Sequence, residues 1–234
     1  MLKGRLLAIA KEVPPSKCIA DIGTDHGLVP VWLIENGIVQ KAIITDISSK
    51  SLAKAEGLIK QRGLESKIEA RTGDGLKPIK PGEVDTVIMA GMGGMLIRNI
   101  LTDAPCVAEK VKRFVLQPMT AQSALRKWLV ENGYAIVDET LVREDSRFYE
   151  IIVATHGSQR IYNEVYYDIG YMLIKKNDPL LKEFIKQKID KTNNIIHHLE
   201  RQNTENSINA AEEFRRKLLQ YKEVYQWVLR LNKS

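Results

Sequence analysis

The sequence predicts an α/β fold: a mostly parallel sheet with helices on both faces, followed by a separate helical segment. Short apolar runs rich in β-branched residues alternate with helical patterns up to about residue 155, which is typical of a parallel sheet covered on both faces. The connection between the last two apolar runs is too short for a parallel crossover, so these runs predict an antiparallel pair. From about Tyr162 onward the strand pattern ends and apolar residues recur at helical spacing.

Five successive apolar runs are expected to form the parallel strands of a Rossmann-like sheet: residues 18–21, 42–46, 67–71, 86–89 and 113–116. The segments between and before them predict helices at about 2–13, 28–36, 48–62, 94–102 and 121–132. Three of these helices are followed by the stop signals Asn36-Gly37, Arg62-Gly63 and Asn132-Gly133. Residues 134–142 and 148–154 are the expected terminal hairpin, with a polar connection at 143–147.

The C-terminal segment predicts a helical hairpin. Apolar residues from Leu181 to Leu199 share one face, and those from Ala211 to Val228 recur at alternating spacings of three and four, the seam of a coiled coil. Residues 202–207 read as the turn, with Asn206 or Ser207 available to cap the second helix. The expected domains are therefore 1–158 and 159–234.

Composition limits the class of protein. With 234 residues, 44% hydrophobic and 27% charged, the chain is long enough for one α/β domain and a smaller appendage. No apolar run approaches the roughly 20 residues that span a bilayer, and the N-terminus lacks the features of a secretion signal. We therefore expect a cytoplasmic protein that is not in the membrane. Its two cysteines are far apart, which predicts neither a disulfide framework nor a metal site.

The net charge of +6 is densest in the tail. A basic surface suits a polyanion such as RNA, because neutralising phosphates releases counterions. The same excess of positive charge also fits a solvated helical face. Charge alone therefore leaves both interpretations open.

The segment from Asp21 to Gly27 follows the first strand and opens a helix, so its small residues allow a ligand to approach backbone N–H groups at the helix N-terminus. Asp25 stands where dinucleotide-binding enzymes more usually have glycine. A carboxylate there does not suit a pyrophosphate but suits the cationic groups of S-adenosylmethionine. We expect Asp21, Gly23 and Gly27 to shape a cofactor turn and Asp25 to contact the methionine end. A tight turn with a capping aspartate is the alternative.

Two further acidic positions follow the next strands. Asp46 ends the second strand, where a carboxylate can accept both ribose hydroxyls, although it can equally cap the helix near Ser48. After the third strand, Gly73-Asp74-Gly75 predicts backbone close to a flat ligand, with Asp74 accepting the adenine amino group. An ordinary Asp-Gly turn is the alternative.

Glycines at the end of the fourth strand indicate space for an acceptor. Gly91 is expected beside the cofactor, and Gly93 and Gly94 beside the substrate, unless they only permit a sharp turn. Gln117, at the end of the fifth strand, can hydrogen-bond the target. His26 is a candidate for proton transfer, although a histidine in a first helical turn is more often structural.

Two catalytic motifs are missing from this edge. The fourth strand has no Asn/Asp-Pro-Pro-Tyr/Phe, which is associated with methylating exocyclic amines, and no Pro-Cys nucleophile for pyrimidine C5. A ring nitrogen such as adenine N1 already carries a lone pair and needs positioning more than deprotonation. The sparse catalytic inventory is consistent with such an acceptor.

Several motifs together resemble those of the bacterial tRNA (adenine-N1)-methyltransferases that modify the adenine at position 22. They are residues 19–27 (IADIGTDHG), 88–94 (IMAGMGG), 116–118 (LQP), 132–134 (NGY) and 148–151 (FYEI), followed by the helical hairpin. The resemblance covers nearly the whole chain. Gly27 stands where the family commonly has alanine.

The resemblance implies a class I methyltransferase fold with a reversed terminal hairpin, S-adenosylmethionine as donor and a coiled-coil domain that helps to engage tRNA. Basic side chains of the tail would contact phosphates: Lys182, Lys186, Arg215, Arg216 and Lys217. Two alternatives are a non-catalytic RNA-binding protein with a vestigial cofactor fold, and a protein or small-molecule methyltransferase that dimerises through its tail. The sequence leaves the oligomeric state open.

Overall fold

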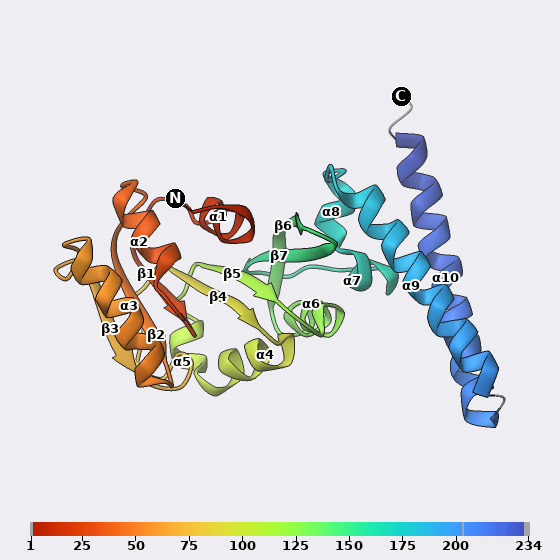
Figure 1. The fold of residues 1–234 in the computed structure, drawn as a ribbon, viewed down its shortest axis with the longest axis horizontal. Coiled ribbons are helices and arrows are strands. Elements are labelled where there is room, and N and C mark those ends of the chain that lie inside the picture. The colour runs from red at the N-terminus through yellow and green to blue at the C-terminus, as the bar shows by residue number, and fades with distance from the viewer. Residues whose placement is uncertain (1, 203, 232–234) are drawn as a thin grey trace. The chain divides into compact units, whose positions relative to one another are not determined.

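The computed structural model describes residues 2–202 and 204–231. The chain divides after Arg160 into two compact units. The first contains a seven-stranded sheet of order β3-β2-β1-β4-β5-β7-β6 (Figure 1). Its strands are β1 (Ser16–Ile22), β2 (Val39–Asp46), β3 (Ile68–Thr72), β4 (Thr86–Met92), β5 (Arg113–Pro118), β6 (Tyr134–Glu144) and β7 (Arg147–His156). Strands β1 to β5 are parallel to one another, and β7 is antiparallel to both neighbours. The predicted Rossmann-like sheet is confirmed.

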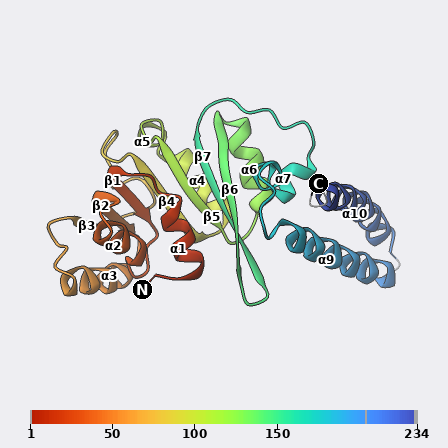
Figure 2. The same cartoon turned by 90° about the horizontal axis from the view of Figure 1, so that it is seen from above.

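Helices cover both faces of this sheet (Figures 1 and 2). One face carries α1 (Gly4–Lys11), α2 (Leu28–Glu35) and α3 (Ser49–Gln61), and the other carries α4 (Gly94–Asp103), α5 (Pro105–Ala108) and α6 (Gln122–Glu131). The central strands are consequently buried on both sides, since the consecutive residues Val87, Ile88 and Met89 of β4 are all fully buried. The short helix α5 has no counterpart among the predicted elements, since four residues are too few to establish a periodicity.

The terminal hairpin is longer than its apolar pattern indicates. Glu144 of β6 pairs directly with Arg147 of β7, so the turn consists of Asp145 and Ser146 alone. Asp145 has the positive φ of 52° that such a tight turn requires. Figure 2 shows the hairpin extending beyond the ends of the neighbouring strands. Arg143, Glu144 and Arg147, which the sequence predicts as part of a polar connection, are therefore paired strand residues.

A buried ion cluster joins the hairpin to α6. Arg126 is fully buried, and its Nε and Nη2 atoms lie 2.6 Å from Glu139 Oε1 and 2.7 Å from Glu150 Oε2. Charges in such a place are tolerated only when paired, because burial removes their hydration. Burial lowers the pKa of Arg126, but the two carboxylates raise it by more, so that it lies above its ordinary value.

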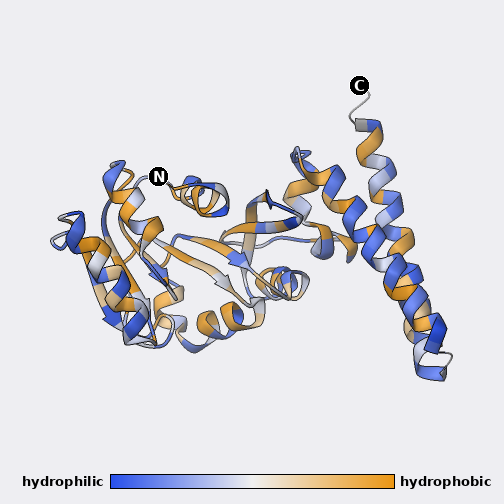
Figure 3. Ribbon diagram, viewed as in Figure 1, coloured by the Kyte–Doolittle hydropathy of each residue, from blue (hydrophilic) through white to orange (hydrophobic). Residues whose placement is uncertain are grey.

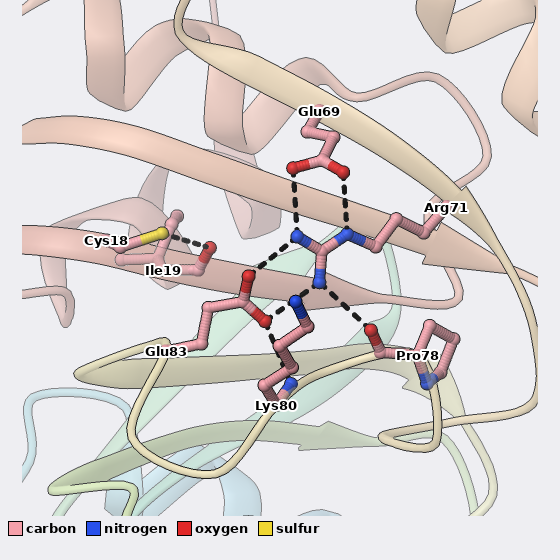
Figure 4. Close-up of polar contacts among 7 residues, drawn as sticks. All are labelled: Cys18, Ile19, Glu69, Arg71, Pro78, Lys80 and Glu83. Carbon is pink, nitrogen blue, oxygen red and sulfur yellow. Dashed lines mark hydrogen bonds and ion pairs between the residues drawn. The ribbon is translucent and has the colours of Figure 1, made fainter.

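A second ion cluster holds the loop after β3 (Figure 4). Arg71 donates to both carboxylate oxygens of Glu83, to those of Glu69 and to the carbonyl of Pro78. Glu83 also accepts from the Lys80 amide at 2.8 Å. The hydrogen bonds from Arg71 lower the pKa of Glu83 to about 2. This cluster ties the segment that begins at Gly73 to the end of β3.

The second unit contains four described helices: α7 (Val165–Ile169), α8 (Tyr171–Lys175), α9 (Leu181–Gln202) and α10 (Glu205–Leu231). The long helices α9 and α10 pack against each other, and both are predominantly hydrophilic with apolar patches (Figure 3). The predicted pair of long helices is confirmed. No helix in the described ranges is long and apolar enough to cross a membrane.

The expected cap of the last helix was wrong. Helix α10 begins at Glu205, before the first residue of its apolar seam. Asn206 and Ser207 therefore lie inside the helix, and neither is its N-cap. Thr204 Oγ1 accepts from the Ser207 amide at 3.2 Å, and Ser207 Oγ accepts from the Thr204 amide at 3.0 Å. This reciprocal pair is a serine version of the capping box.

Candidate active site

The segment between β1 and α2 requires its two glycines. Gly23 and Gly27 have φ values of 72° and 64°, in the left-handed region that favours glycine. A Cβ at Gly23 would lie 3.0 Å from the side chain of Met92, and one at Gly27 would lie 3.2 Å from Ala55. The Gly27 amide donates to Thr24 Oγ1 at 3.1 Å, so the turn is closed from within.

This turn forms one wall of a pocket of about 290 Å³. The pocket brings together five of the predicted ligand residues and the candidate proton-transfer residue His26, and adds side chains that the sequence did not indicate. Its lining is Arg5, Leu6, Asp21, Gly23, Thr24, Asp25, His26, Gly27, Leu28, Val29, Ala90 and Gly91. A larger cavity of about 450 Å³ lies at the starts of β2 and β3. Ligands of open α/β sheets bind at the carboxyl ends of the strands, which favours the smaller pocket.

Asp21 is the electrostatically distinctive residue of the pocket. It is 7% exposed, and burial raises its pKa to about 6, although a hydrogen bond with Thr24 partly offsets that effect. No cation of the described chain pairs with it. The next helix, α2, has no side-chain cap, and Leu28 and Val29 of its first turn line the pocket. A buried carboxylate beside uncapped N–H groups fits a ligand that carries both an ammonium and a carboxylate.

Asp25 and His26 are more exposed and are already paired with each other. His26 Nδ1 lies 2.7 Å from Asp25 Oδ2, and Lys54 Nζ lies 3.0 Å from Asp25 Oδ1. The hydrogen bond from Lys54 lowers the pKa of Asp25. Lys54 lies on α3, and no local pattern in the sequence connects it with this turn. Asp25 can therefore meet a cationic ligand only in competition with Lys54.

Asp46 and the glycine-flanked Asp74 follow adjacent strands. Asp46 Oδ1 accepts from the Ser48 amide at 2.6 Å, and the Asp46 carbonyl accepts from the Gly73 amide at 3.0 Å. Ser48, and not Asp46, caps α3, by accepting from the Ser51 amide at 3.3 Å. Asp74 lies 2.5 Å from Lys77 Nζ. These residues lie outside the lining of the pocket described above.

Both glycines that flank Asp74 are required by packing. A Cβ at Gly73 would lie 2.3 Å from Pro78, and one at Gly75 would lie 2.8 Å from Ile100. Gly75 also has a φ of 57°. The segment is therefore held close to its neighbours whether or not a ligand is present.

Strand β4 bends at Gly91. Its pairing with β5 shifts register between Ala90 and Met92, and Gly91 has a φ of 79°. Gly94 meets a different constraint, because a Cβ there would lie 2.8 Å from the carbonyl oxygen of Ala121. Gly93 is the N-cap residue of α4. Only Gly91 of these three glycines lines the pocket.

Gln117 is fully buried, and its amide is bound within the protein. Its Oε1 accepts from Arg5 Nη1 and, at 3.2 Å, from the Gly91 amide, while its Nε2 donates to the Pro118 carbonyl at 3.1 Å. Gln117 therefore positions Gly91 and Arg5. The role of Arg5 could not be read from the sequence, because 112 residues separate it from Gln117.

The five basic residues predicted for the tail differ in their pairing. Arg215 lies 2.5 Å from Glu200, and Lys217 lies 2.8 Å from Asp168. Lys182, Lys186 and Arg216 are exposed and make no ion pair within residues 161–202 and 204–231. The latter three are available to a polyanion without displacing a carboxylate.

Comparisons with known proteins show which family the chain resembles. A family model described as a methyltransferase domain matches residues 2–152. The tRNA (adenine(22)-N(1))-methyltransferase of Bacillus subtilis is 33% identical over 204 residues, which are 85% of this chain and 85% of that protein.

Solved structures match over nearly the full length. The crystal structure of the B. subtilis m1A22 tRNA methyltransferase TrmK has a TM-score of 0.87 at 31% identity and covers 96% of this chain and 99% of that chain. A Streptococcus pneumoniae protein in complex with S-adenosyl-L-methionine has a TM-score of 0.85 at 28% identity, covering 96% and 100%. The chain therefore belongs to the tRNA (adenine(22)-N(1))-methyltransferase family.

Proposed function

We propose that this protein transfers the methyl group of S-adenosylmethionine to N1 of an adenine in tRNA, at position 22 as the name of its B. subtilis relative states. The observation that carries the proposal is the pocket at the carboxyl ends of β1 and β4. There the buried Asp21, the uncapped start of α2 and the bend at Gly91 converge.

The donor's methionine end is assigned first to Asp21. Its buried carboxylate has no cationic partner among the described residues, whereas Asp25 is already bound by Lys54 and His26. An ammonium group beside Asp21 would compensate for its burial, and the amides of Leu28 and Val29 would receive a carboxylate. Asp25 is a secondary contact at this end.

The rest of the donor is assigned to the neighbouring strand ends. Asp46, with one carboxylate oxygen occupied by the Ser48 amide, would accept from the ribose. Asp74 and its flanking Gly73 and Gly75 would contact the adenine. When bound, S-adenosylmethionine supplies an electrophilic methyl group.

The acceptor side requires positioning more than proton transfer. N1 of adenine attacks through its own lone pair and the product is a cation, so no base has to remove a proton for the bond to form. Gly91 leaves space at the bend of β4, with Gly93 and Gly94 following it toward α4. Gln117 holds that bend in place, and His26 is assigned no obligatory catalytic role.

We assign residues 1–158 to catalysis and 159–234 to engaging tRNA in the cytoplasm. Lys182, Lys186 and Arg216, which are not paired within the described part of the tail, would bind phosphates. Reaching N1 in a folded tRNA requires partial unstacking of the adenine, and contacts with the backbone help to offset that cost.

The test is methylation of an unmodified tRNA transcript with labelled S-adenosylmethionine, followed by mapping of the product by mass spectrometry. A transcript with guanine in place of adenine 22 is the matched control. We expect one N1-methyladenine at position 22 and none in the control. Label in protein, or RNA binding without methylation and without affinity for S-adenosylhomocysteine, would contradict the proposal.

A further inference from the structure

Two arginines that are distant in sequence meet one tyrosine ring in the first unit. The guanidinium carbon of Arg5, on α1, lies 5.0 Å from the centroid of Tyr149, and that of Arg147 lies 5.8 Å from it. Both distances are within the range of a cation–π interaction. Arg5 also lines the pocket beside Gly91. Both guanidinium groups therefore lie against one ring, and that of Arg5 also borders the donor pocket.

Neither guanidinium is neutralised. Within residues 2–202 and 204–231, no carboxylate lies within ion-pair distance of either side chain. Arg5 uses Nη1 to contact Gln117 and Met119, which leaves its Nε and Nη2 donors available. The nearby carboxylate of Glu144 accepts from the backbone amide of Arg5, at 2.7 Å. The arginines Arg71 and Arg126, by contrast, are each bound by two glutamates.

We propose that Arg5 and Arg147 bind a backbone phosphate of the nucleotide whose base enters the pocket, and that Tyr149 is a positioning residue for both. The inference rests on the proposed function. A planar guanidinium presents paired donors to phosphate oxygens. Because Arg5 also lines the pocket, a phosphate bound there belongs to the target nucleotide or its immediate neighbour. Holding that phosphate stabilises the unstacked conformation of the target base.

The experiment uses the full-length protein and measures tRNA affinity as a function of salt, with S-adenosylhomocysteine affinity measured by calorimetry. The variants are Arg147→Ala, Tyr149→Ala and Tyr149→Phe. Lys41→Ala is the matched control, because Lys41 is an exposed cation on a strand and lines the separate cavity at the starts of β2 and β3.

We expect Arg147→Ala to weaken tRNA binding about tenfold near 0.1 M salt and to lower the salt slope by about 1, with the affinity for S-adenosylhomocysteine unchanged. Tyr149→Ala should match it, and Tyr149→Phe should retain wild-type affinity because the ring face remains. Lys41→Ala should behave as the wild type does.

Equal tRNA affinity and equal salt slope for Arg147→Ala and Lys41→Ala would overturn the inference, whatever Tyr149→Ala does to folding. If the wild type methylates tRNA under those conditions, only this inference fails. If the wild type does not methylate tRNA at all, the proposed function fails with it.

Discussion

At the scale of single residues, the buried Asp21 provides a test of stability and a test of the proposed cofactor site. Its pKa is about 6 in the folded protein against 3.8 for an ordinary aspartate, so the folded state holds the proton more tightly than the unfolded state. Stability from this residue is therefore lost as the pH rises from about 4 to about 6. Asp21→Asn should stabilise the ligand-free protein at pH 7.5 by up to about 3 kcal/mol and have little effect at pH 3.5, as measured by urea unfolding.

The same substitution should have the opposite effect on the cofactor. A protonated Asp21 no longer attracts an ammonium group, so wild-type affinity for S-adenosylhomocysteine should fall as the pH drops below about 6. Asp21→Asn should bind weakly and without this pH dependence, while Asp25→Asn should retain it. Calorimetry at pH 5 and pH 7.5 would measure these affinities. An Asp21→Asn variant that binds S-adenosylhomocysteine as tightly as the wild type would refute the assignment of the ammonium group to Asp21.

His26 provides a separate residue-scale test of the chemistry. Its ring is held by Asp25 at 2.7 Å, and methylation of a ring nitrogen does not require a base. His26→Ala should therefore lower the single-turnover rate by less than tenfold, compared with the roughly 10²- to 10⁴-fold loss expected for a general base. A loss in that larger range would make His26 a catalytic residue.

At the scale of elements, the ion cluster of α6, β6 and β7 governs the stability of the hairpin. Arg126→Met removes the buried cation that pairs with both Glu139 and Glu150. Breaking a buried pair of this kind costs about 3–5 kcal/mol, which urea unfolding would measure. Arg62→Met, which removes an exposed partner of Glu35, should cost no more than about 1 kcal/mol. Similar costs for the two variants would show that the cluster does not stabilise the hairpin.

At the scale of the whole molecule, the charges of the tail should contribute to the affinity for tRNA. The triple variant Lys182→Ala, Lys186→Ala, Arg216→Ala should bind tRNA more weakly, with a salt slope reduced by up to about 3, because each cation can release counterions. The double variant Arg215→Ala, Lys217→Ala should change the slope less per residue, because Glu200 and Asp168 already compensate those charges. Fluorescence titrations over a range of salt concentrations would distinguish the two.

The sequence alone was sufficient for the order of the strands and the longer helices and for the turn at Gly23 and Gly27. Strand and helix periodicities are local properties, and the short link between β6 and β7 permits only an antiparallel pair. The short helix α5 escaped prediction, and α7 and α8 lie in a segment that was predicted only as helical from about Tyr162, since five residues or fewer hold no full amphipathic repeat.

The glycines of the predicted site were found because they follow predicted strands, but their environments came from the fold. A local pattern indicates that Gly91 and Gly94 permit unusual backbone. It does not indicate that Gly91 faces the pocket while Gly94 packs against the Ala121 carbonyl. For Gln117, the sequence indicated a position at the end of a strand. It did not indicate that Gln117 binds Arg5.

The sequence by itself therefore determined the fold class, the glycine-containing turn after β1 and the family resemblance, all of which depend on residues close together along the chain. The tertiary structure alone decided which charges are paired: Asp25 with Lys54, Arg126 with two glutamates, and Arg5 with Gln117 and Tyr149. Most of these partners come from different elements, far apart in the chain, and only packing of the sheet and its helices brings their side chains within a few ångströms of one another.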